Sequence, residues 1–306
     1  MSAAAESGAR LRATLIGGTA VLMWGTLALL TTMSGRVPPF LLVALTFTVG
    51  FSLALAKWLI LRDRGWRHLR QPVGVWALGI FGLFGYHAFY FTALRSAPAV
   101  EASLIAYLAP LLIILFSALL PGERLRWYHV LGAFAGLAGA VVLLAGGKGF
   151  GFQGIYWFGY LAAAACALIW SSYSVLSRRY AHVPTDIIGG YCGVAAILAI
   201  LCHIAFERTI WPDGLEWLAI LGIGLGPVGA AFYTWDHGCK RGDIKAVGAA
   251  MYLTPLLSTM LLIAFGRAVP TWALAAACAL ITGGALIAAG DLLKKRNGAV
   301  RARRVS

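Results

Sequence analysis

The chain has 306 residues, of which 60% are hydrophobic and 12% charged, and its net charge is +14. Soluble domains carry about 25% charged residues, so the composition excludes a water-soluble globular protein and predicts a surface that faces lipid. The positive charge does not indicate nucleic-acid binding, because the Lys and Arg residues lie in short gaps between apolar runs and in the tails, not along one face. The partner that the composition predicts is a lipid bilayer.

Ten apolar runs are long enough to cross the hydrocarbon core of a bilayer, which takes about 20 residues of helix. Helices satisfy their own backbone groups in lipid, and runs of this length without strict alternation exclude a β-barrel. We therefore predict an all-α integral membrane protein with ten transmembrane helices. The expected spans are Ala13–Met33, Phe40–Ile60, Val73–Leu94, Pro98–Leu119, Trp127–Ala145, Gly154–Ser177, Asp186–Phe206, Leu215–Trp235, Asp243–Phe265 and Thr271–Ala289.

A repeat divides the chain into two halves. The stretch Ala106–Leu112 contains Tyr-Leu-Ala-Pro-Leu-Leu, and 145 residues later Met251–Leu257 contains Tyr-Leu-Thr-Pro-Leu-Leu. Trp127 and Trp272 correspond at the same offset. The alternative is that two Leu-rich helices share these letters by composition alone. The predicted organisation is a first five-helix unit over residues 1–146, a second over 147–291 and a basic tail over 292–306.

The basic residues are unevenly distributed between the two sets of gaps. One set, which includes both tails, holds 20 of the 25 Lys and Arg residues, and the other set holds 5. Because basic loops stay in the cytoplasm, both termini are expected there. Two units of five spans then have opposite orientations. Such inverted repeats are an architecture of transporters, which bind substrate near the midplane between the repeats.

Two prolines lie within the repeated stretches. Pro110 and Pro255 each remove a backbone hydrogen bond from a span and bend it. They are either a matched pair of hinges or static kinks that shape packing. Tyr107 and Tyr252 precede the prolines by three residues, so each lies on the same helix face as its proline.

The third span carries a row of rings. Tyr86 and Tyr90 are one helical turn apart, and His87 is also one turn from Tyr90. A ring-rich, mildly polar face suits a cavity for aromatic or amphipathic ligands, although interior packing and a structural histidine are the alternatives. Its counterpart in the second unit contains Trp235, which we place near the cytoplasmic end of its span.

The first spans of the two units carry a further pair of tryptophans. Trp24 and Trp170 correspond at an offset of 146, and Tyr173 follows Trp170 by one turn. Hydroxyl groups next to Trp170 could bind the amino or carboxylate group of a zwitterion, or they are helix-packing groups. Trp24, Trp170 and Tyr173 therefore join the candidate site.

Motifs for other functions are missing from the sequence. There is no phosphate-binding Gly loop followed by Lys-Ser or Lys-Thr, no HExxH and no nucleophile elbow, so we predict neither an enzyme nor a cofactor. The five cysteines form no CxxC pair and are interpreted as small apolar fillers, so no metal site is expected. Asp236 and Asp243 bracket a turn with Lys240 and Arg241 that we interpret as structural. No pair of acids lies at mid-membrane, so the signal for ion coupling is weak.

The two units with their Tyr-Leu-x-Pro-Leu-Leu stretches, and the Gly122-Glu123 turn before a small-residue helix, resemble the ten-span, EamA-type branch of the drug/metabolite transporter superfamily. The resemblance covers essentially the whole chain. One departure is that Gly266-Arg267 stands in the second unit where Gly-Glu is expected. The resemblance implies alternating access to a site between the two units.

The Tyr86-His87-x-x-Tyr90 face is similar to that of the YddG-type exporters of aromatic amino acids. This likeness implies export of aromatic and other neutral amino acids across a bacterial inner membrane, by a protein that we expect to be a monomer. Rival expectations are a broad exporter of drugs or other metabolites and a non-transporting receptor or scaffold. The expected lining of the cavity is Trp24, Tyr86, His87, Tyr90, Tyr107, Trp170, Tyr173, Trp235 and Tyr252, with Pro110 and Pro255 as hinges.

Overall fold

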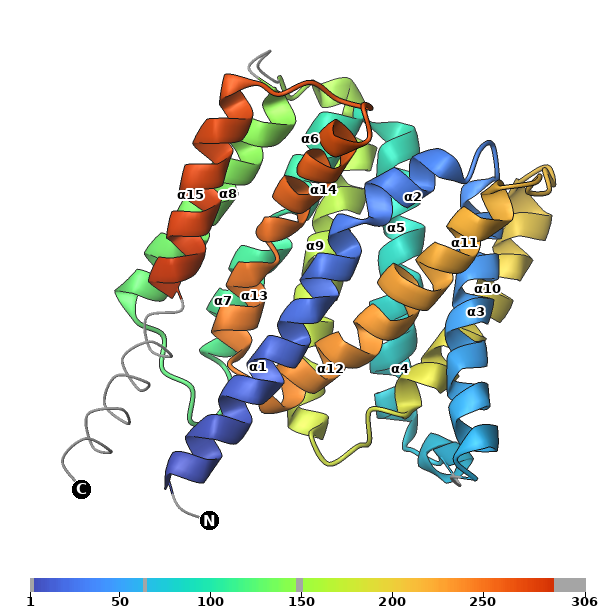
Figure 1. Ribbon diagram of the computed structural model, residues 1–306, viewed down its shortest axis with the longest axis horizontal. Helices are drawn as coiled ribbons and strands as arrows, with labels where there is room; N and C mark the ends of the chain where they lie inside the picture. The colour runs from blue at the N-terminus through green and yellow to red at the C-terminus, as the bar shows by residue number, and fades with distance from the viewer. Residues whose placement is uncertain (1–2, 63–64, 147–150, 289–306) are drawn as a thin grey trace.

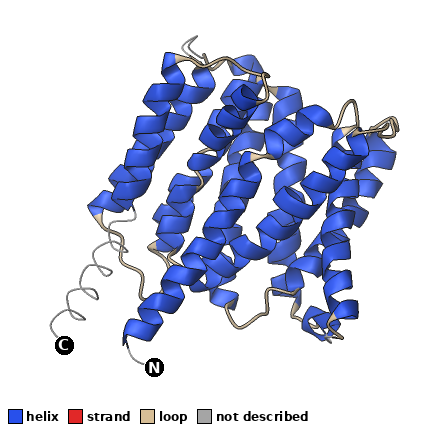
Figure 2. Cartoon of the chain, in the orientation of Figure 1, coloured by secondary structure: helices blue, strands red, loops and turns tan. Residues whose placement is uncertain are grey.

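The computed structural model describes residues 3–62, 65–146 and 151–288, and these parts contain helices and loops only (Figure 2). The helices up to residue 146 are α1 (Ala3–Gly25), α2 (Leu27–Met33), α3 (Pro39–Ile60), η1 (Gly65–Leu69), α4 (Val73–Ile80), η2 (Phe81–Gly85), α5 (Tyr86–Ser96), α6 (Ala99–Ala106), α7 (Ala109–Ser117) and α8 (Trp127–Ala145). Those that follow are η3 (Gly154–Tyr156), α9 (Trp157–Ser177), η4 (Arg178–Tyr180), α10 (Ile187–Phe206), α11 (Glu216–Leu225), η5 (Gly226–Ala230), α12 (Ala231–Arg241), α13 (Ile244–Ala250), α14 (Leu253–Ala264) and α15 (Trp272–Ala288).

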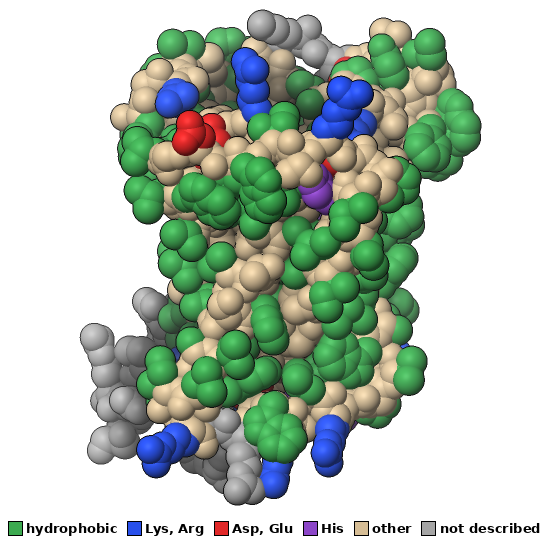
Figure 3. Space-filling model, turned by 90° about the vertical axis from the view of Figure 1, so that its right-hand side faces the viewer, with side chains coloured by type: hydrophobic (Ala, Val, Ile, Leu, Met, Phe, Trp, Pro, Cys, Tyr) green, Lys and Arg blue, Asp and Glu red, His purple; other side chains and the backbone are tan. Residues whose placement is uncertain are grey.

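These helices confirm the predicted ten spans. Within the described residues, nine helical stretches of 18 residues or more are apolar enough to cross a membrane, and α15 is a tenth, shorter apolar helix. On the face that Figure 3 shows, charged side chains gather at the two ends, and hydrophobic side chains and backbone cover most of the middle. The basic tail 292–306, Ala289, Arg64 and Lys148 lie outside the described residues.

The two sets of five spans run in opposite directions. Arg10 lies near the start of α1 and Arg178 directly follows α9, yet both contact the same carboxylate oxygen of Glu123, at 3.1 and 3.2 Å. The start of α1 and the end of α9 therefore lie at one end of the bundle. In Figure 1, α1 begins at the lower edge of the bundle.

Breaks in the helices recur at matching places in the two halves. The π-helical segments η2 and η5 interrupt the third and eighth spans at an offset of 145 residues. The fourth span is broken between Ala106 and Ala109, and the ninth is broken between Ala250 and Leu253. Pro110 and Pro255 follow these breaks, where backbone hydrogen bonds shorten to the i→i−3 type.

The helices pack in symmetry-related pairs. Helix α1 packs against α12 as α9 packs against α5, while α3 packs on α10 and α8 on α15. In the α8–α15 pair, a Cβ added at Gly132 would lie 2.5 Å from the carbonyl oxygen of Gly284, and a Cβ at Gly284 would lie as close to that of Gly132. Glycine at positions 132 and 284 therefore allows the backbones of α8 and α15 to approach closely.

Ion pairs of Glu123 connect four segments at the lower end of the bundle. Its carboxylate pairs with Lys245 at 2.6 Å as well as with Arg10 and Arg178, and Arg10 also pairs with Asp243 at 3.2 Å. Burial alone would raise the pKa of Glu123, but the hydrogen bond and charge of Lys245 and the charges of Arg10 and Arg178 hold this pKa below its ordinary value.

This network predicts a loss of stability in acid. A carboxyl whose pKa is lowered by folding stabilises the protein above the pKa it has when unfolded, about 4.5, and this contribution disappears as the pH falls through the lower folded value. We expect Glu123→Gln to lower the melting temperature at pH 7, and the gap from wild type to narrow as the pH falls from about 4.5 toward 3.5. Thermal unfolding in detergent across this range measures the gap. A gap that is independent of pH would contradict the assignment.

Candidate functional site

Three tryptophans from the two halves of the chain meet at the centre of the bundle. The ring centroid of Trp24, at the end of α1, lies 5.5 Å from that of Trp170 on α9 and 5.0 Å from that of Trp235 on α12. Trp170 and Trp235 lie 5.7 Å apart in a stacked arrangement, with 29° between their ring planes. Trp170 and Trp235 are buried, and Trp24 is half-buried. Aromatic rings at these separations attract one another beyond their burial, so the cluster is a preformed aromatic surface.

A second group of rings continues this surface onto α5. Tyr86 lies 5.4 Å from Trp170 and stacks on Tyr90 at 5.9 Å, with only 6° between the two ring planes. His87 contacts Phe47 of α3 at 5.2 Å and Phe232 of α12 at 6.3 Å. Tyr86, His87 and Tyr90 are half-buried. Residues from α1, α3, α5, α9 and α12 thus form one continuous group, which we call the ring cluster.

The π-helical segments position two members of the ring cluster. The indole N–H of Trp24 donates to the carbonyl of Pro227 in η5 at 2.9 Å, and His87 Nδ1 lies 2.7 Å from the carbonyl of Leu83 in η2. A carbonyl only accepts, so Nδ1 carries the hydrogen, and Nε2 of a neutral His87 is left as an acceptor. A π segment disturbs the regular backbone hydrogen bonds and is often found at functional sites. Here each one provides a carbonyl that holds a ring in place.

Trp235 is the most deeply buried of the three tryptophans. The sequence places Trp235 in the candidate cavity and near the cytoplasmic end of its span. In the structure Trp235 is fully buried in the ring cluster, with its indole N–H donating to Ser174 Oγ at 3.1 Å. The physical reason is that α1 covers α12, with Gly17 against Gly238 so closely that a Cβ on either would clash. The burial of Trp235 therefore depends on the helix that covers it and not on its distance from a loop.

The other expected site residues lie at different distances from the ring cluster. Tyr107, in the break before α7, is half-buried and lies in the neighbourhood of Tyr90. Tyr252 is buried in a second hydrophobic core with α8 and α15, where a Cβ at Gly136 would meet its ring. A role for Tyr252 in the cavity stays a prediction. Phe47 and Phe232 belong to the cluster but are not among the expected residues, because an apolar ring within an apolar run gives no distinct signal.

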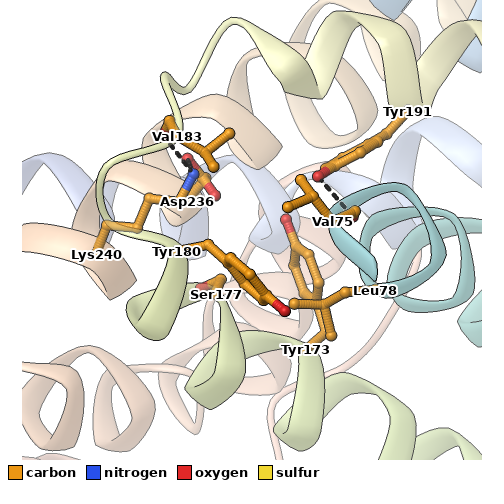
Figure 4. Close-up of a pocket in the computed structure, with 9 residues that line it drawn as sticks. All are labelled: Val75, Leu78, Tyr173, Ser177, Tyr180, Val183, Tyr191, Asp236 and Lys240. Atoms are coloured by element: carbon orange, nitrogen blue, oxygen red, sulfur yellow. Dashed lines mark hydrogen bonds and ion pairs between the residues drawn. The ribbon is translucent and has the colours of Figure 1, made fainter. Parts of the chain in front are cut away.

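A small pocket lies between α9, α12, α4 and α10 (Figure 4). Tyr173 belongs to both places, since its ring lies 5.5 Å from Trp170 and its side chain also lines the pocket. The Tyr173 hydroxyl is buried and has no hydrogen-bond partner among the described residues. The residues that line the pocket are Val75, Leu78, Tyr173, Ser177, Tyr180, Val183, Tyr191, Asp236 and Lys240.

The region offers aromatic rings, hydroxyl groups and a buried ion pair. Among the described residues, no group of three or more His, Cys, Asp or Glu side chains could hold a metal ion. Rings from two oppositely oriented sets of helices enclose an aromatic surface in the interior of a lipid-facing bundle. Fold and site together define a multi-pass membrane transporter with inverted repeats.

The chain belongs to the EamA-like transporter family, whose model matches it twice, over residues 11–145 and 157–290. It is 60% identical over 288 residues to a protein of Ancylobacter novellus named aromatic amino acid exporter YddG, a match that covers 94% of this chain and 99% of the relative. A protein of the same name from Escherichia coli is 25% identical, over 82% of this chain and 88% of the relative. A crystal structure at 60% identity superimposes with a TM-score of 0.87, covering 91% of this chain and 98% of that one. The resemblance seen in the sequence is thereby confirmed.

Proposed function

We propose that this protein exports amino acids, preferentially aromatic and other neutral ones, across a bacterial inner membrane. The observation that carries the proposal is the ring cluster, in which Trp24, Tyr86, His87, Trp170 and Trp235 from both halves enclose one aromatic surface. Such a surface gives dispersion and edge-to-face contacts to an aromatic side chain and cation–π contacts to an ammonium group. The name of the relative from Ancylobacter novellus supports the same substrate class.

The mechanism we infer is alternating access. The site lies between two inverted units, 1–146 and 147–291, and the broken spans that carry Pro110 and Pro255 act as the hinges that open it to one side and then to the other. Both termini face the cytoplasm, which the basic loops at that end of the bundle support. One copy of the chain suffices, because the ring cluster draws its residues from both halves of a single chain.

A counterflow experiment tests this function. Purified protein in liposomes loaded with unlabelled phenylalanine is expected to take up labelled phenylalanine, with saturation, and tryptophan and tyrosine are expected to compete better than threonine. A nucleoside and a quaternary amine are included to detect a broad exporter of drugs or metabolites. Stronger competition by either of these than by tryptophan would replace the proposed substrate class. The absence of saturable flux in folded protein would overturn the transport function itself.

A further inference from the structure

Two oppositely charged side chains are buried together beside the ring cluster. Asp236 Oδ2 and Lys240 Nζ lie 2.9 Å apart on successive turns of α12, and their side chains are 2% and 4% exposed. Burying two charges costs more free energy than their attraction returns unless further hydrogen bonds help. Ionisable groups inside a membrane span usually serve function for this reason. The sequence interprets Asp236 and Lys240 as part of a structural turn, and their burial inside the bundle adds a functional role as a second interpretation.

Hydrogen bonds from the segment between α9 and α10 hold the pair, and both side chains line the pocket. Thr185 Oγ1 donates to Asp236 Oδ2 at 2.7 Å, and Lys240 Nζ donates to the carbonyl of Val183 at 3.1 Å. Figure 4 shows the pair on one side of the pocket and the hydroxyl of Tyr173 on the other. The pocket thus combines an anion, a cation and a hydroxyl with no partner among the described residues.

The pocket and the ring cluster are neighbours between α9 and α12, because Tyr173 contacts Trp170 and also lines the pocket. On α12, Phe232 lies one turn before Asp236, and on α9, Trp170 lies one turn before Tyr173. The rings of Trp170 and Phe232 are 6.0 Å apart, so the two helices meet through these rings at the ring cluster. A ligand that placed an aromatic group among the rings would place atoms one turn further along next to the charged pair.

An amino acid has this arrangement of groups. Its side chain is separated by two bonds from an ammonium and a carboxylate group, and both charges need partners where water is scarce. The members of the ring cluster carry no permanent charge. Among the described residues, the other buried carboxylates in ion pairs lie at the ends of the bundle, where Glu207 already binds Arg95 and His203, and Glu123 already binds three cations.

We propose that Asp236 and Lys240 bind the zwitterionic end of the substrate, with the carboxylate of Asp236 receiving the ammonium group and the ammonium of Lys240 receiving the carboxylate. This inference rests on the proposed function and deepens it. One internal ion pair is exchanged for two pairs with the ligand, and the net charge of the site does not change. The free space in the pocket is about 10 Å³, close to that of one water molecule, so binding requires α9 and α12 to separate.

The experiment removes one charge at a time from the protein and from the ligand. Labelled phenylalanine counterflow in liposomes is competed with phenylalanine, with phenethylamine, which lacks the carboxylate, and with 3-phenylpropionate, which lacks the ammonium group. Wild type is expected to prefer phenylalanine over each analogue by about tenfold or more, the value of a hydrogen bond to a charged group. In Asp236→Asn the preference over 3-phenylpropionate disappears, and in Lys240→Met the preference over phenethylamine disappears.

The double variant Asp236→Asn with Lys240→Met protects the test against misfolding, because it leaves no unpaired buried charge. It is expected to fold, as judged by thermal unfolding, and to lose both preferences while tryptophan still competes better than threonine. Asp186→Asn is the control, since Asp186 pairs with the more exposed Lys57 outside the pocket and its loss should change neither preference.

The possible outcomes separate the two proposals. The crossed loss of preference supports the inference. Unchanged preferences in folded variants, or an equal loss of affinity for all three ligands, would overturn it and assign the pair a structural role. If wild-type protein shows no saturable phenylalanine flux, the proposed function itself fails, whatever the variants do.

Discussion

Replacing Tyr90 with alanine is expected to lower phenylalanine efflux about tenfold or more. Tyr90 is half-buried, and its ring stacks on Tyr86 at 5.9 Å, so it presents one face of the ring cluster. An aromatic contact contributes about 0.5–1.5 kcal/mol beyond the area that it buries, and about 1.4 kcal/mol is a factor of ten. Initial rates of labelled phenylalanine efflux from proteoliposomes measure the effect. His87→Ala is expected to act in the same direction, because His87 lies between Tyr86 and Phe47.

Two variants on the same helix make this result specific. Tyr90→Phe keeps the stacked ring and is expected to keep most of the efflux. Phe89 is next to Tyr90 and 38% exposed, and it has no ring contact within the cluster, so Phe89→Ala is expected to transport normally. If Phe89→Ala lost as much efflux as Tyr90→Ala, the ring cluster would not be the site.

The second large effect concerns stability. A methyl group added at Gly284 of α15 would lie 2.5 Å from the carbonyl oxygen of Gly132 and 2.8 Å from the amide nitrogen of Gly136 on α8. Backbone atoms cannot move aside as a flexible side chain can, so α8 and α15 must separate. Overpacking of this kind costs about 1–3 kcal/mol. We therefore expect Gly284→Ala to lower the melting temperature in detergent by several degrees, while the KM of the remaining folded protein is unchanged.

The neighbouring glycine provides the matched control. A methyl group at Gly283 meets no atom within 4 Å, so Gly283→Ala creates no clash. Alanine within a helix is more stable than glycine by about 0.5–1 kcal/mol, and the melting temperature is expected to stay constant or rise. Equal melting temperatures for Gly283→Ala and Gly284→Ala would show that the two helices do not pack as described.

Much of this architecture can be predicted from the sequence, because its causes are local. The length and apolarity of each run determine the spans, and the repeated Tyr-Leu-x-Pro-Leu-Leu stretches indicate the two broken spans. Gly132 and Gly284 can be identified because only small residues allow two backbones to approach. Each of these patterns carries its own physical reason within a few residues.

The centre of the site is harder to predict, because burial there is decided by segments far apart in the chain. The burial of Trp235 follows from the packing of α1 on α12, which the sequence near Trp235 does not reveal. Phe47 cannot be distinguished in the sequence from other apolar rings in its span. Asp236 and Lys240 do leave a signal in the sequence. Opposite charges four residues apart on a helix are neighbours, and this spacing is enough to mark the two residues as a candidate pair.

The π-helical segments provide a way for the contacts between α9 and α12 to change. A π-helical turn contains one residue more than an α-helical turn. When this turn converts to α-helix, the part of the helix beyond it rotates by about 100° around its own axis without changing direction. In η5 such a conversion would swing Phe232 and Asp236 away from α9 together, at the expense of the hydrogen bond from Trp24 to Pro227. Amide hydrogen exchange in residues 226–230, with and without phenylalanine, would report it. One rotation of α12 about its axis would then remove both the aromatic and the ionic contacts of a bound substrate at the same time.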